Sequence, residues 1–359
     1  MNTQPNTPAA RARTEALRVR DLRVYYHTQR GAVRAVDGIN FSLIKGERLG
    51  LVGESGSGKS TIALALMRLI RPPGKIESGQ TFLGETDLLS LSENEMRRTR
   101  LARIALVPQG AMNSLNPVMR IKHQLIDGML AHGTRGSRHE LETRVEELMG
   151  WVGLRKEVPE MYPHELSGGM KQRVCIAMGI CLRPEVIVAD EPTSALDVVV
   201  QRQVMETLQS VQEQLGASVI LVGHDMGVMA QYTDSIAVMY AGHIVESGPV
   251  IDVFEEPLHP YTRLLIATLP TLKAKSSFRG IPGIPPSLLD PPRGCPFHPR
   301  CPSRFARCDV EAPGYIEVRP RRMVACHLFD SAGAGSIAQR TAVGDPSAAS
   351  GEPRIGGER

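Results

Sequence analysis

Apolar and polar positions alternate with a period of two in several short stretches, which is the pattern of half-buried β-strands. The stretch from Leu17 to Tyr26 alternates in this way, and Phe41-Ser-Leu43 indicates a second strand. Farther along, Ser235 to Tyr240 and Ile244-Val-Glu246 are joined by Ala241-Gly242-His243, and this arrangement predicts a β-hairpin.

Continuous apolar runs predict a second kind of strand, one that is buried on both faces. Three such runs are Arg48–Val52, Glu185–Ala189 and Ser218–Val222, and a further strand is predicted at Ile104–Pro108. The segment from Thr61 to Ile70 has helical character. Strands that alternate with helices in this order predict an α/β fold, in which helices cover both faces of the sheet.

The composition changes along the chain. Residues 1–16 are rich in Thr, Pro, Ala and Arg, and we expect a disordered lead there. Between about residues 87 and 180 the pattern is mostly helical. Proline recurs from 281 to 292, which excludes a regular element. Residues 330–359 are dominated by Gly, Ala, Ser and charged side chains, and we expect a disordered tail.

Charge and hydropathy exclude several classes of protein. The net charge is only +4, and the densest basic group, at residues 97–103, has the spacing of a solvated helix face, so nucleic acid is not predicted as a partner. No run of 18 apolar residues predicts a transmembrane helix. The polar segment from Met1 to Glu15 lacks the apolar core of an export signal, which predicts a cytoplasmic protein. Its six cysteines are then expected to be reduced thiols or metal ligands.

The segment Gly53-Glu-Ser-Gly-Ser-Gly-Lys-Ser60 matches a phosphate-binding loop, or P-loop, between a predicted strand and a predicted helix. Its glycines allow backbone N–H groups to wrap the β-phosphate of a nucleotide. Lys59 is expected to contact the β- and γ-phosphates, and the Ser60 hydroxyl to ligate Mg²⁺. The residues predicted to bind nucleotide here are Gly53, Glu54, Ser55, Gly56, Ser57, Gly58, Lys59, Ser60 and Thr61.

Four polar residues follow predicted strands at the edge where open α/β sheets bind ligands. Asp190 is placed to hold Mg²⁺ through water, and Glu191 to polarise the attacking water as a general base. Gln109 could reach both the Mg²⁺ and the water, and His224 could touch the γ-phosphate. A lone residue of these types is often structural, but the shared position of all four at neighbouring strand ends favours a catalytic site.

A second anion-binding pattern is Leu166-Ser-Gly-Gly-Met-Lys-Gln-Arg173. Ser167 can cap a helix, while Gly168 and Gly169 let backbone N–H groups approach an anion closely. Tyr26 could stack on an adenine ring or could serve only as a sheet residue. Two phosphate-binding surfaces that are more than a hundred residues apart suggest that the chain supplies half of a composite site.

The chain resembles the ATPases of ABC transporters over residues 17–265, and this resemblance covers a helical subdomain at about 110–180. Its motifs stand in the order of that family: residues 53–60, Gln109, residues 166–173, Ile187 to Glu191, Ser194-Ala-Leu-Asp197 and His224. Three further segments are similar to the dipeptide/oligopeptide/nickel importer branch, namely Gln109 to Pro117, His259-Pro-Tyr-Thr-Arg263 and Gly294 to Cys301.

The resemblance implies an ABC cassette, with a RecA-like core, an antiparallel β subdomain and an inserted helical subdomain. It also implies a head-to-tail dimer with a second ATPase subunit, which the branch suggests is a different chain. Ser167, Gly168 and Gly169 would then bind the γ-phosphate of ATP held by the partner, and Asp197 would cross the interface. Met170 stands where the commonest family signature has Gln.

The same resemblance implies partners and a location. The chain would work with two membrane permease subunits and an extracytoplasmic substrate-binding protein, at the cytoplasmic face of the inner (plasma) membrane. ATP binding would close the dimer and hydrolysis would reopen it, which would drive peptide uptake.

Alternative functions are the import of nickel chelates or oligosaccharides, a soluble ABC ATPase that acts on ribosomes or in DNA repair, and a nucleotide sensor whose sibling hydrolyses ATP. The sequence shows neither the long inserted coiled coil of the repair enzymes nor the two cassettes of the translation factors. The presence of both Glu191 and His224 argues against the sensor.

Four cysteines lie in an expected C-terminal extension at residues 266–329. Cys295, Cys301, Cys308 and Cys326 are separated by five, six and seventeen residues. Four thiolates can bind Zn²⁺ or a [4Fe–4S] cluster, and the spacing does not select between them or exclude four free thiols. The resemblance to peptide-importer ATPases favours [4Fe–4S]. Cys175 and Cys181 are expected to be core residues.

Overall fold

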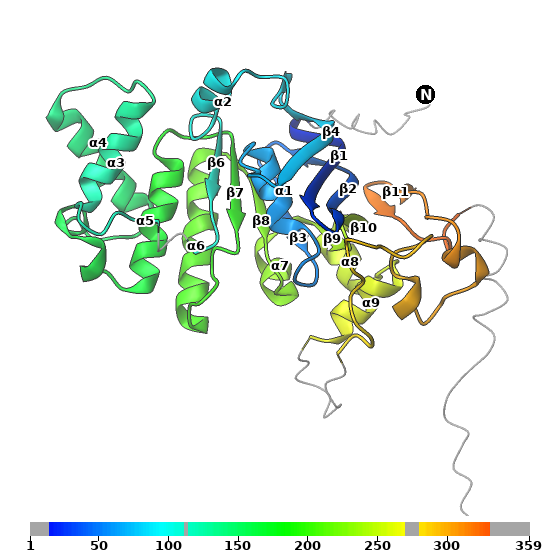
Figure 1. The fold of residues 1–359 in the computed structure, drawn as a ribbon. Helices are drawn as coiled ribbons and strands as arrows, with labels where there is room; N and C mark the ends of the chain where they lie inside the picture. The colour runs from blue at the N-terminus through cyan, green and yellow to red at the C-terminus, as the bar shows by residue number, and fades with distance from the viewer. Residues whose placement is uncertain (1–13, 111–113, 270–279, 331–359) are drawn as a thin grey trace, which may run out of the picture.

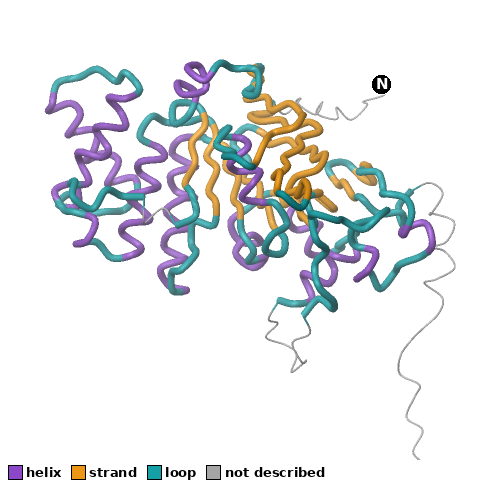
Figure 2. The backbone as a smooth tube through the Cα atoms, in the orientation of Figure 1, coloured by secondary structure: helices purple, strands orange, loops and turns teal. Residues whose placement is uncertain are grey.

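The computed structural model describes residues 14–110, 114–269 and 280–330 (Figure 1). Two β-sheets lie in the middle of the molecule, with a helical lobe on one side and the C-terminal extension on the other (Figure 2). The strands are β1 Glu15–Thr28, β2 Gly31–Ile44, β3 Arg48–Val52, β4 Gly74–Leu83, β5 Thr86–Asp87, β6 Ile104–Val107, β7 Val186–Asp190, β8 Ser218–Val222, β9 Ser235–Tyr240, β10 His243–Pro249, β11 Ile316–Arg319 and β12 Arg322–Val324. The helices are α1 Lys59–Leu66, α2 Glu93–Thr99, α3 Ile121–Ala131, α4 Arg138–Trp151, α5 Gly168–Ile180, α6 Val198–Leu215, α7 Met226–Tyr232, α8 Val250–Glu255 and α9 Pro260–Ala267.

The larger sheet has the strand order β11-β12-β10-β9-β3-β8-β7-β6. Strands β9, β3, β8, β7 and β6 are parallel, which confirms the α/β fold and the buried strands that the apolar runs predict. The β9–β10 hairpin is confirmed as well. Since the central strands are parallel, the residues that follow β3, β7 and β8 meet at one edge of the sheet.

The two faces of this sheet are covered differently. One face packs against α5, α6 and α7, as predicted, and contributes Ile187 and Leu221 to that core. The other face, which contributes Val188 and Val222, packs against α1 and the strands of the second sheet. The prediction that helices cover both faces is therefore only partly correct, because the second face packs against a β-sheet as well as against α1.

The second sheet is antiparallel, in the order β2-β1-β4-β5. The predicted strand from Leu17 is longer in the structure, and the predicted segment at 41–43 is only the end of β2. Register shifts in the β1–β2 pair break the alternation on which the prediction relied. Glu15 and Ala16 belong to β1, so the expected disordered lead is wrong at these two residues; residues 1–13 lie outside the described part.

The helical lobe consists of α3, α4 and α5, and it stands apart from the second sheet (Figure 1). Ser137 and Glu140 form a capping box that starts α4. Cys175 and Cys181 are buried in the core that this lobe shares with the larger sheet, which confirms the prediction for both.

The C-terminal extension is continuous with the larger sheet. The proline-rich stretch has no helix or strand, as predicted, but the β11–β12 hairpin that follows was not predicted. Strand β12 pairs with β10, with Val324 opposite Glu246. The expected tail lies outside the described residues from 331 onward. Each helix in the described ranges is too short or too polar to cross a membrane.

Candidate functional site

The P-loop connects β3 to α1, the context that the sequence predicts. Gly53 and Gly58 have φ angles of 150° and 106°, which favour glycine. A Cβ atom at Gly53 would lie 2.1 Å from the Met239 carbonyl oxygen, and one at Gly58 would lie 2.0 Å from that of Ala35. These two glycines are therefore required both by the backbone conformation and by close contact with neighbouring strands.

Lys59 is buried, and its ammonium group lies under the loop. Its Nζ donates to the carbonyl oxygens of Gly53 at 2.9 Å and Glu54 at 2.8 Å. Burial lowers the pKa of Lys59, whereas the nearby carboxylates of Glu191, Asp190 and Glu54 raise it. The lysine thus brings a positive charge to a glycine loop that exposes backbone N–H groups, as the binding of a polyphosphate requires.

Asp190 and Ser60 meet beside the P-loop. The Ser60 hydroxyl donates to Asp190 Oδ1 at 3.1 Å, although the two residues are 130 positions apart in sequence. Burial raises the pKa of Asp190, and the hydrogen bond from Ser60 opposes that effect. A hydroxyl and a carboxylate that meet beside a phosphate loop form the oxygen-rich pair that Mg²⁺ prefers.

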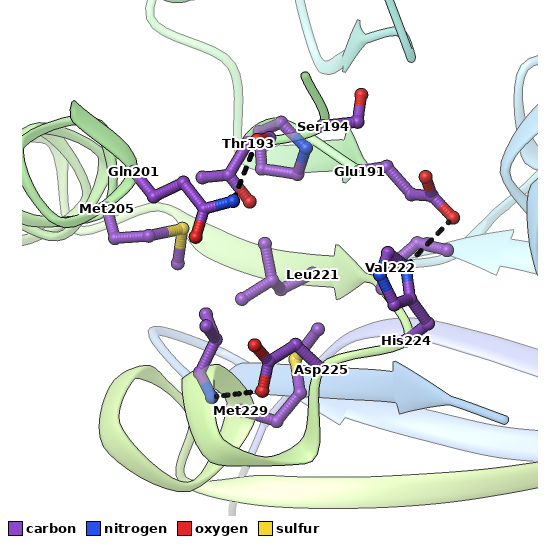
Figure 3. Close-up of a pocket in the computed structure, with 13 residues that line it drawn as sticks. Glu191, Thr193, Ser194, Gln201, Met205, Leu221, Val222, His224, Asp225 and Met229 are labelled. Atoms are coloured by element: carbon purple, nitrogen blue, oxygen red, sulfur yellow. Dashed lines mark hydrogen bonds and ion pairs between the residues drawn. The ribbon is translucent and has the colours of Figure 1, made fainter. Parts of the chain in front are cut away.

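Glu191, Gln109 and His224 converge next to this pair. Gln109 Nε2 donates to Glu191 Oε2 at 2.8 Å, and His224 Nδ1 lies 3.6 Å from Glu191 Oε1. Figure 3 shows the His224 ring facing the Glu191 carboxylate across the ends of β7 and β8. The structure therefore brings together the four strand-end residues that the sequence predicts to form one site.

The backbone of Glu191 is held in an uncommon conformation. Its φ angle is 45°, in the left-handed region, and its N–H donates to the carbonyl oxygen of Val222 at 2.9 Å. A hollow beside it is lined by residues that include Thr193, Ser194 and Gln201 (Figure 3). The side chain of Glu191 is 19% exposed, so a water molecule can reach the carboxylate.

The Ser167-Gly168-Gly169 segment lies away from the P-loop of its own chain. Ser167 is the N-cap of α5 and accepts a hydrogen bond from Met170 N, which confirms the predicted cap. Helix α5 contacts α3, α4, α6 and β6, whereas α1 contacts β2, β7 and β8. A Cβ atom at Gly169 would lie 2.5 Å from Val200 Cγ1, so this glycine also permits the close packing of α5 on α6, a role that its sequence context did not reveal.

Asp197 and Tyr26, which are predicted to bind a partner and adenine, have local structural roles in the fold. Asp197 caps α6 and accepts hydrogen bonds from Val199 N and Val200 N at 3.1 and 3.0 Å. Tyr26 lies on β1, half-buried, with its ring against Gly74 of β4. The predicted contacts of Asp197 with a partner and of Tyr26 with adenine stay predictions.

Two residues that sequence reasoning missed hold the P-loop from the C-terminal side. Tyr261 of α9 accepts a hydrogen bond from Glu54 N at 3.0 Å. Arg300 forms a two-point ion pair with the Glu54 carboxylate, at 2.7 and 2.9 Å. Both lie in segments that resemble the importer branch, but that similarity does not indicate which residue they contact.

All four cysteines of the extension line one small cavity, together with residues that include His259 and His327. They are not joined by disulfides. Burial raises the pKa of Cys295 to about 11 and that of Cys326 to about 12. However, no three His, Cys, Asp or Glu side chains of the described ranges are arranged to hold a metal ion, so the expected metal site is not confirmed.

Comparisons with known proteins agree with the geometry of the site. A profile of the ABC transporter family matches residues 36–194, and a profile of the oligopeptide/dipeptide transporter C-terminal region matches residues 245–308. The chain is 44% identical over 316 residues to the dipeptide transport ATP-binding protein DppD of Caldanaerobacter subterraneus subsp. tengcongensis, with 88% of this chain and 97% of that protein covered. It is also 44% identical over 323 residues to the oligopeptide transport ATP-binding protein OppD of Escherichia coli, with 89% and 95% covered.

Solved structures of related cassettes share the fold. A dimeric structure of the ATP-binding cassette MJ0796 bound to ADP and Pi has a TM-score of 0.59 and 25% identity, over 65% of this chain and 98% of that one. The structure of cbiO1 from Clostridium perfringens, part of the ABC transporter complex cbiONQ, has a TM-score of 0.58 and 26% identity, over 68% and 92%.

Proposed function

The chain belongs to the ATP-binding proteins of ABC transporters, in the oligopeptide/dipeptide family, and from this membership we propose that it is the ATP-hydrolysing subunit of a peptide importer. The observation that carries the proposal is the convergence of the P-loop with Asp190, Glu191, Gln109 and His224 at one sheet edge. Peptides are proposed as cargo because curated relatives at 44% identity are dipeptide and oligopeptide transport proteins.

Each residue of the site has a proposed task. The P-loop N–H groups and Lys59 bind the β- and γ-phosphates, and Ser60 with Asp190 would hold Mg²⁺, which draws charge from the phosphate oxygens. Glu191 accepts a proton from the attacking water, with Gln109 fixing the orientation of its carboxylate. His224, whose side chain is 68% exposed, is free to reach the γ-phosphate.

A test of the site compares two carboxylates that flank the same strand. Glu191→Gln should lower ATP hydrolysis by at least about a hundredfold while ATP binding persists, because only the base is lost. Glu185→Gln is the control, since Glu185 precedes β7 and pairs with Arg103 at the surface. Equal turnover in wild type and Glu191→Gln would overturn the role of Glu191.

We also propose that the site is completed by a second cassette. In support, α5, which Ser167 caps, and α1, which follows the P-loop, pack on different elements of the chain. Next to Asp197, Val198 and Val199 are 80% and 67% exposed, which is unusual for large apolar residues and fits a surface that a partner covers. ATP should convert Glu191→Gln from monomers to dimers with the partner ATPase in size-exclusion chromatography; monomers at saturating ATP would contradict this.

The remaining partners follow from the family. We propose that two membrane permeases anchor the chain at the cytoplasmic face of the inner (plasma) membrane, and that an extracytoplasmic binding protein delivers the cargo. Affinity purification of the chain from membranes should recover these proteins. The ligand eluted from the binding protein then distinguishes peptides from nickel chelates or oligosaccharides.

For the C-terminal extension we propose that Cys295, Cys301, Cys308 and Cys326 hold a [4Fe–4S] cluster. The support is that all four thiols line one enclosed cavity and are not disulfide-bonded. Iron bound to the four sulfur atoms would stabilise their thiolate form, although Cys295, Cys308 and Cys326 are buried, and the cluster would cross-link this segment. Anaerobic purification should yield about four iron atoms per chain with visible absorption. Stoichiometric zinc without iron would overturn the cluster in favour of a zinc site.

A further inference from the structure

The C-terminal extension makes direct contact with the P-loop through one ion pair. The Arg300 side chain is 4% exposed and that of Glu54 is 25% exposed, and they are 246 residues apart in sequence. Nη1 and Nη2 of Arg300 donate to the two carboxylate oxygens of Glu54 at 2.7 and 2.9 Å. A two-point contact of this kind fixes both the position and the orientation of the carboxylate.

The other donors of Arg300 are used as well. Nε donates to the carbonyl oxygen of Pro282 at 2.9 Å, Nη2 to that of Ile281 at 3.3 Å, and Nη1 to the hydroxyl of Tyr240 at 3.3 Å. The guanidinium also lies over the Tyr240 ring, at 5.8 Å from its centroid. The arginine is therefore held rigidly by the extension and by β9 before it reaches the loop.

A second contact reaches the same P-loop residue. Phe297, three positions before Arg300, packs against the rings of Tyr240 and Tyr261 with centroid distances of 5.1 and 5.4 Å. The Tyr261 hydroxyl accepts the hydrogen bond from Glu54 N. The carbonyl oxygen of Glu54 meanwhile accepts from Lys59 Nζ. The carboxylate, the N–H and the C=O of Glu54 are thus all fixed, two of them from the C-terminal part of the chain.

The charge of Glu54 has a consequence for ligand binding. A carboxylate on a loop that receives a polyphosphate repels that ligand and competes for Lys59, whereas a paired carboxylate does neither. We propose that Arg300 is a positioning residue of the nucleotide site, which neutralises Glu54 and holds the P-loop so that tight ATP binding depends on the C-terminal extension. This inference rests on the proposed function, because it assumes that the loop binds ATP.

The test is a double-mutant cycle on the full-length chain, read as the Kd for Mg-ATP by calorimetric titration. Arg300→Ala should raise the Kd about tenfold, the equivalent of about 1.4 kcal/mol. In the Glu54→Gln background the same substitution should change the Kd by less than about threefold, because no charge is left to neutralise. Arg300→Lys, which keeps the charge but makes one contact, should fall between wild type and Arg300→Ala.

Two controls separate this role from general stabilisation of the extension. Arg304 lies in the same cysteine-rich segment and pairs with Asp309 at the surface, so Arg304→Ala should leave the Kd unchanged. Salt should shrink the Arg300→Ala effect between about 0.05 and about 0.5 M, because the lost interaction is electrostatic. In the assembled transporter Arg300→Ala should raise KM for ATP with little change in kcat.

The outcomes are distinct. A wild-type chain that binds no ATP would overturn the proposed function and this inference together. A wild type that binds ATP and an Arg300→Ala variant that binds it equally well would overturn only the inference. If Arg300→Ala weakens ATP binding as strongly in the Glu54→Gln background as in the wild type, the inference is also overturned. Charge neutralisation requires that removal of the Glu54 charge abolish most of the effect. If Arg300→Ala does not fold, Arg300→Lys and the double variant carry the same comparison.

Discussion

The buried ion pair between Arg322 of β12 and Glu246 of β10 provides a quantitative prediction. The two side chains are 3% and 0% exposed, and their closest contact is 2.9 Å. Glu246 also accepts hydrogen bonds from Leu258 N and His259 N, both at 2.9 Å. Arg322→Met keeps the volume and apolar stem but leaves the carboxylate buried without its positive partner, which should lower the free energy of unfolding.

The size of the loss follows from what remains around Glu246. Removal of one partner of a buried pair costs about 3–5 kcal/mol. Two backbone donors still bind the carboxylate after the substitution. In addition, Arg322 Nη1 is buried without a hydrogen-bond partner among the described residues, so removal of this group relieves an existing desolvation cost. We therefore expect the lower end of that range. A loss of about 3 kcal/mol corresponds to a fall in Tm of about 4 °C for a chain of this size.

Circular dichroism during urea and thermal unfolding measures this loss. The matched control is Arg319→Met in the same hairpin, because Arg319 and Glu256 form a pair in which both side chains are 59% exposed; it should cost less than about 1 kcal/mol. Addition of Glu246→Gln to Arg322→Met should recover part of the stability, since the uncompensated charge is removed. If Arg322→Met costs no more than Arg319→Met, the argument from the buried charge is refuted.

Three further predictions concern packing, capping and pH. Gly169→Ala should destabilise the fold by about 1–3 kcal/mol, measured by urea unfolding, because the added methyl group would contact Val200. Addition of Val200→Ala should recover much of this stability. A Gly169→Ala variant as stable as the wild type would contradict the close packing. Ser167→Ala should cost about 1 kcal/mol of stability through loss of the α5 cap, and Ser167→Asn, which restores a cap, should recover it. Burial lowers the pKa of His259 from 6.5 to about 3, so the stabilising contribution of the neutral side chain is present above pH 6.5 and is lost as the pH falls below it, by up to about 1.4 kcal/mol per pH unit. This loss should be absent in His259→Asn, whose side chain can still cap α9. Equal dependence of unfolding free energy on pH in the two proteins would contradict the prediction.

The sequence correctly predicted that the candidate site residues meet at one edge of the sheet, because its signals are local. The P-loop is a contiguous segment. Asp190 ends β7, Glu191 follows it and His224 comes after β8, and the parallel pairing of these two short apolar strands brings the three residues to one edge. The pattern was weaker where alternation fails. Register shifts interrupt the period-two pattern of β2, so the pattern predicted only the end of this strand. In β11 every second residue is exposed and the others are only half-buried, so this strand lacks a clear apolar face.

The contacts of Glu54 illustrate what the sequence did not contain. A glutamate in a P-loop predicts proximity to nucleotide, and nothing near it in the chain indicates Arg300 as its partner. Such a pair arises only when the extension has folded back on the cassette, and neither periodicity nor motif spacing encodes the contact. The spacing of the four cysteines, in contrast, correctly predicted that they lie together, since all four line one cavity.

The pairing of β12 with β10 also constrains how the protein is made. On a ribosome the chain emerges from its N-terminus, so β10 is available about 80 residues before Val324, its partner beside Glu246. At a synthesis rate of 5–20 residues per second this interval lasts roughly 4–16 s. During that time β10 presents an unpaired edge and an uncompensated carboxylate, which favours pairing with another nascent chain. Strand β12 therefore protects the edge of β10 from aggregation, and chains that end before β12 should be removed by proteases rather than accumulate.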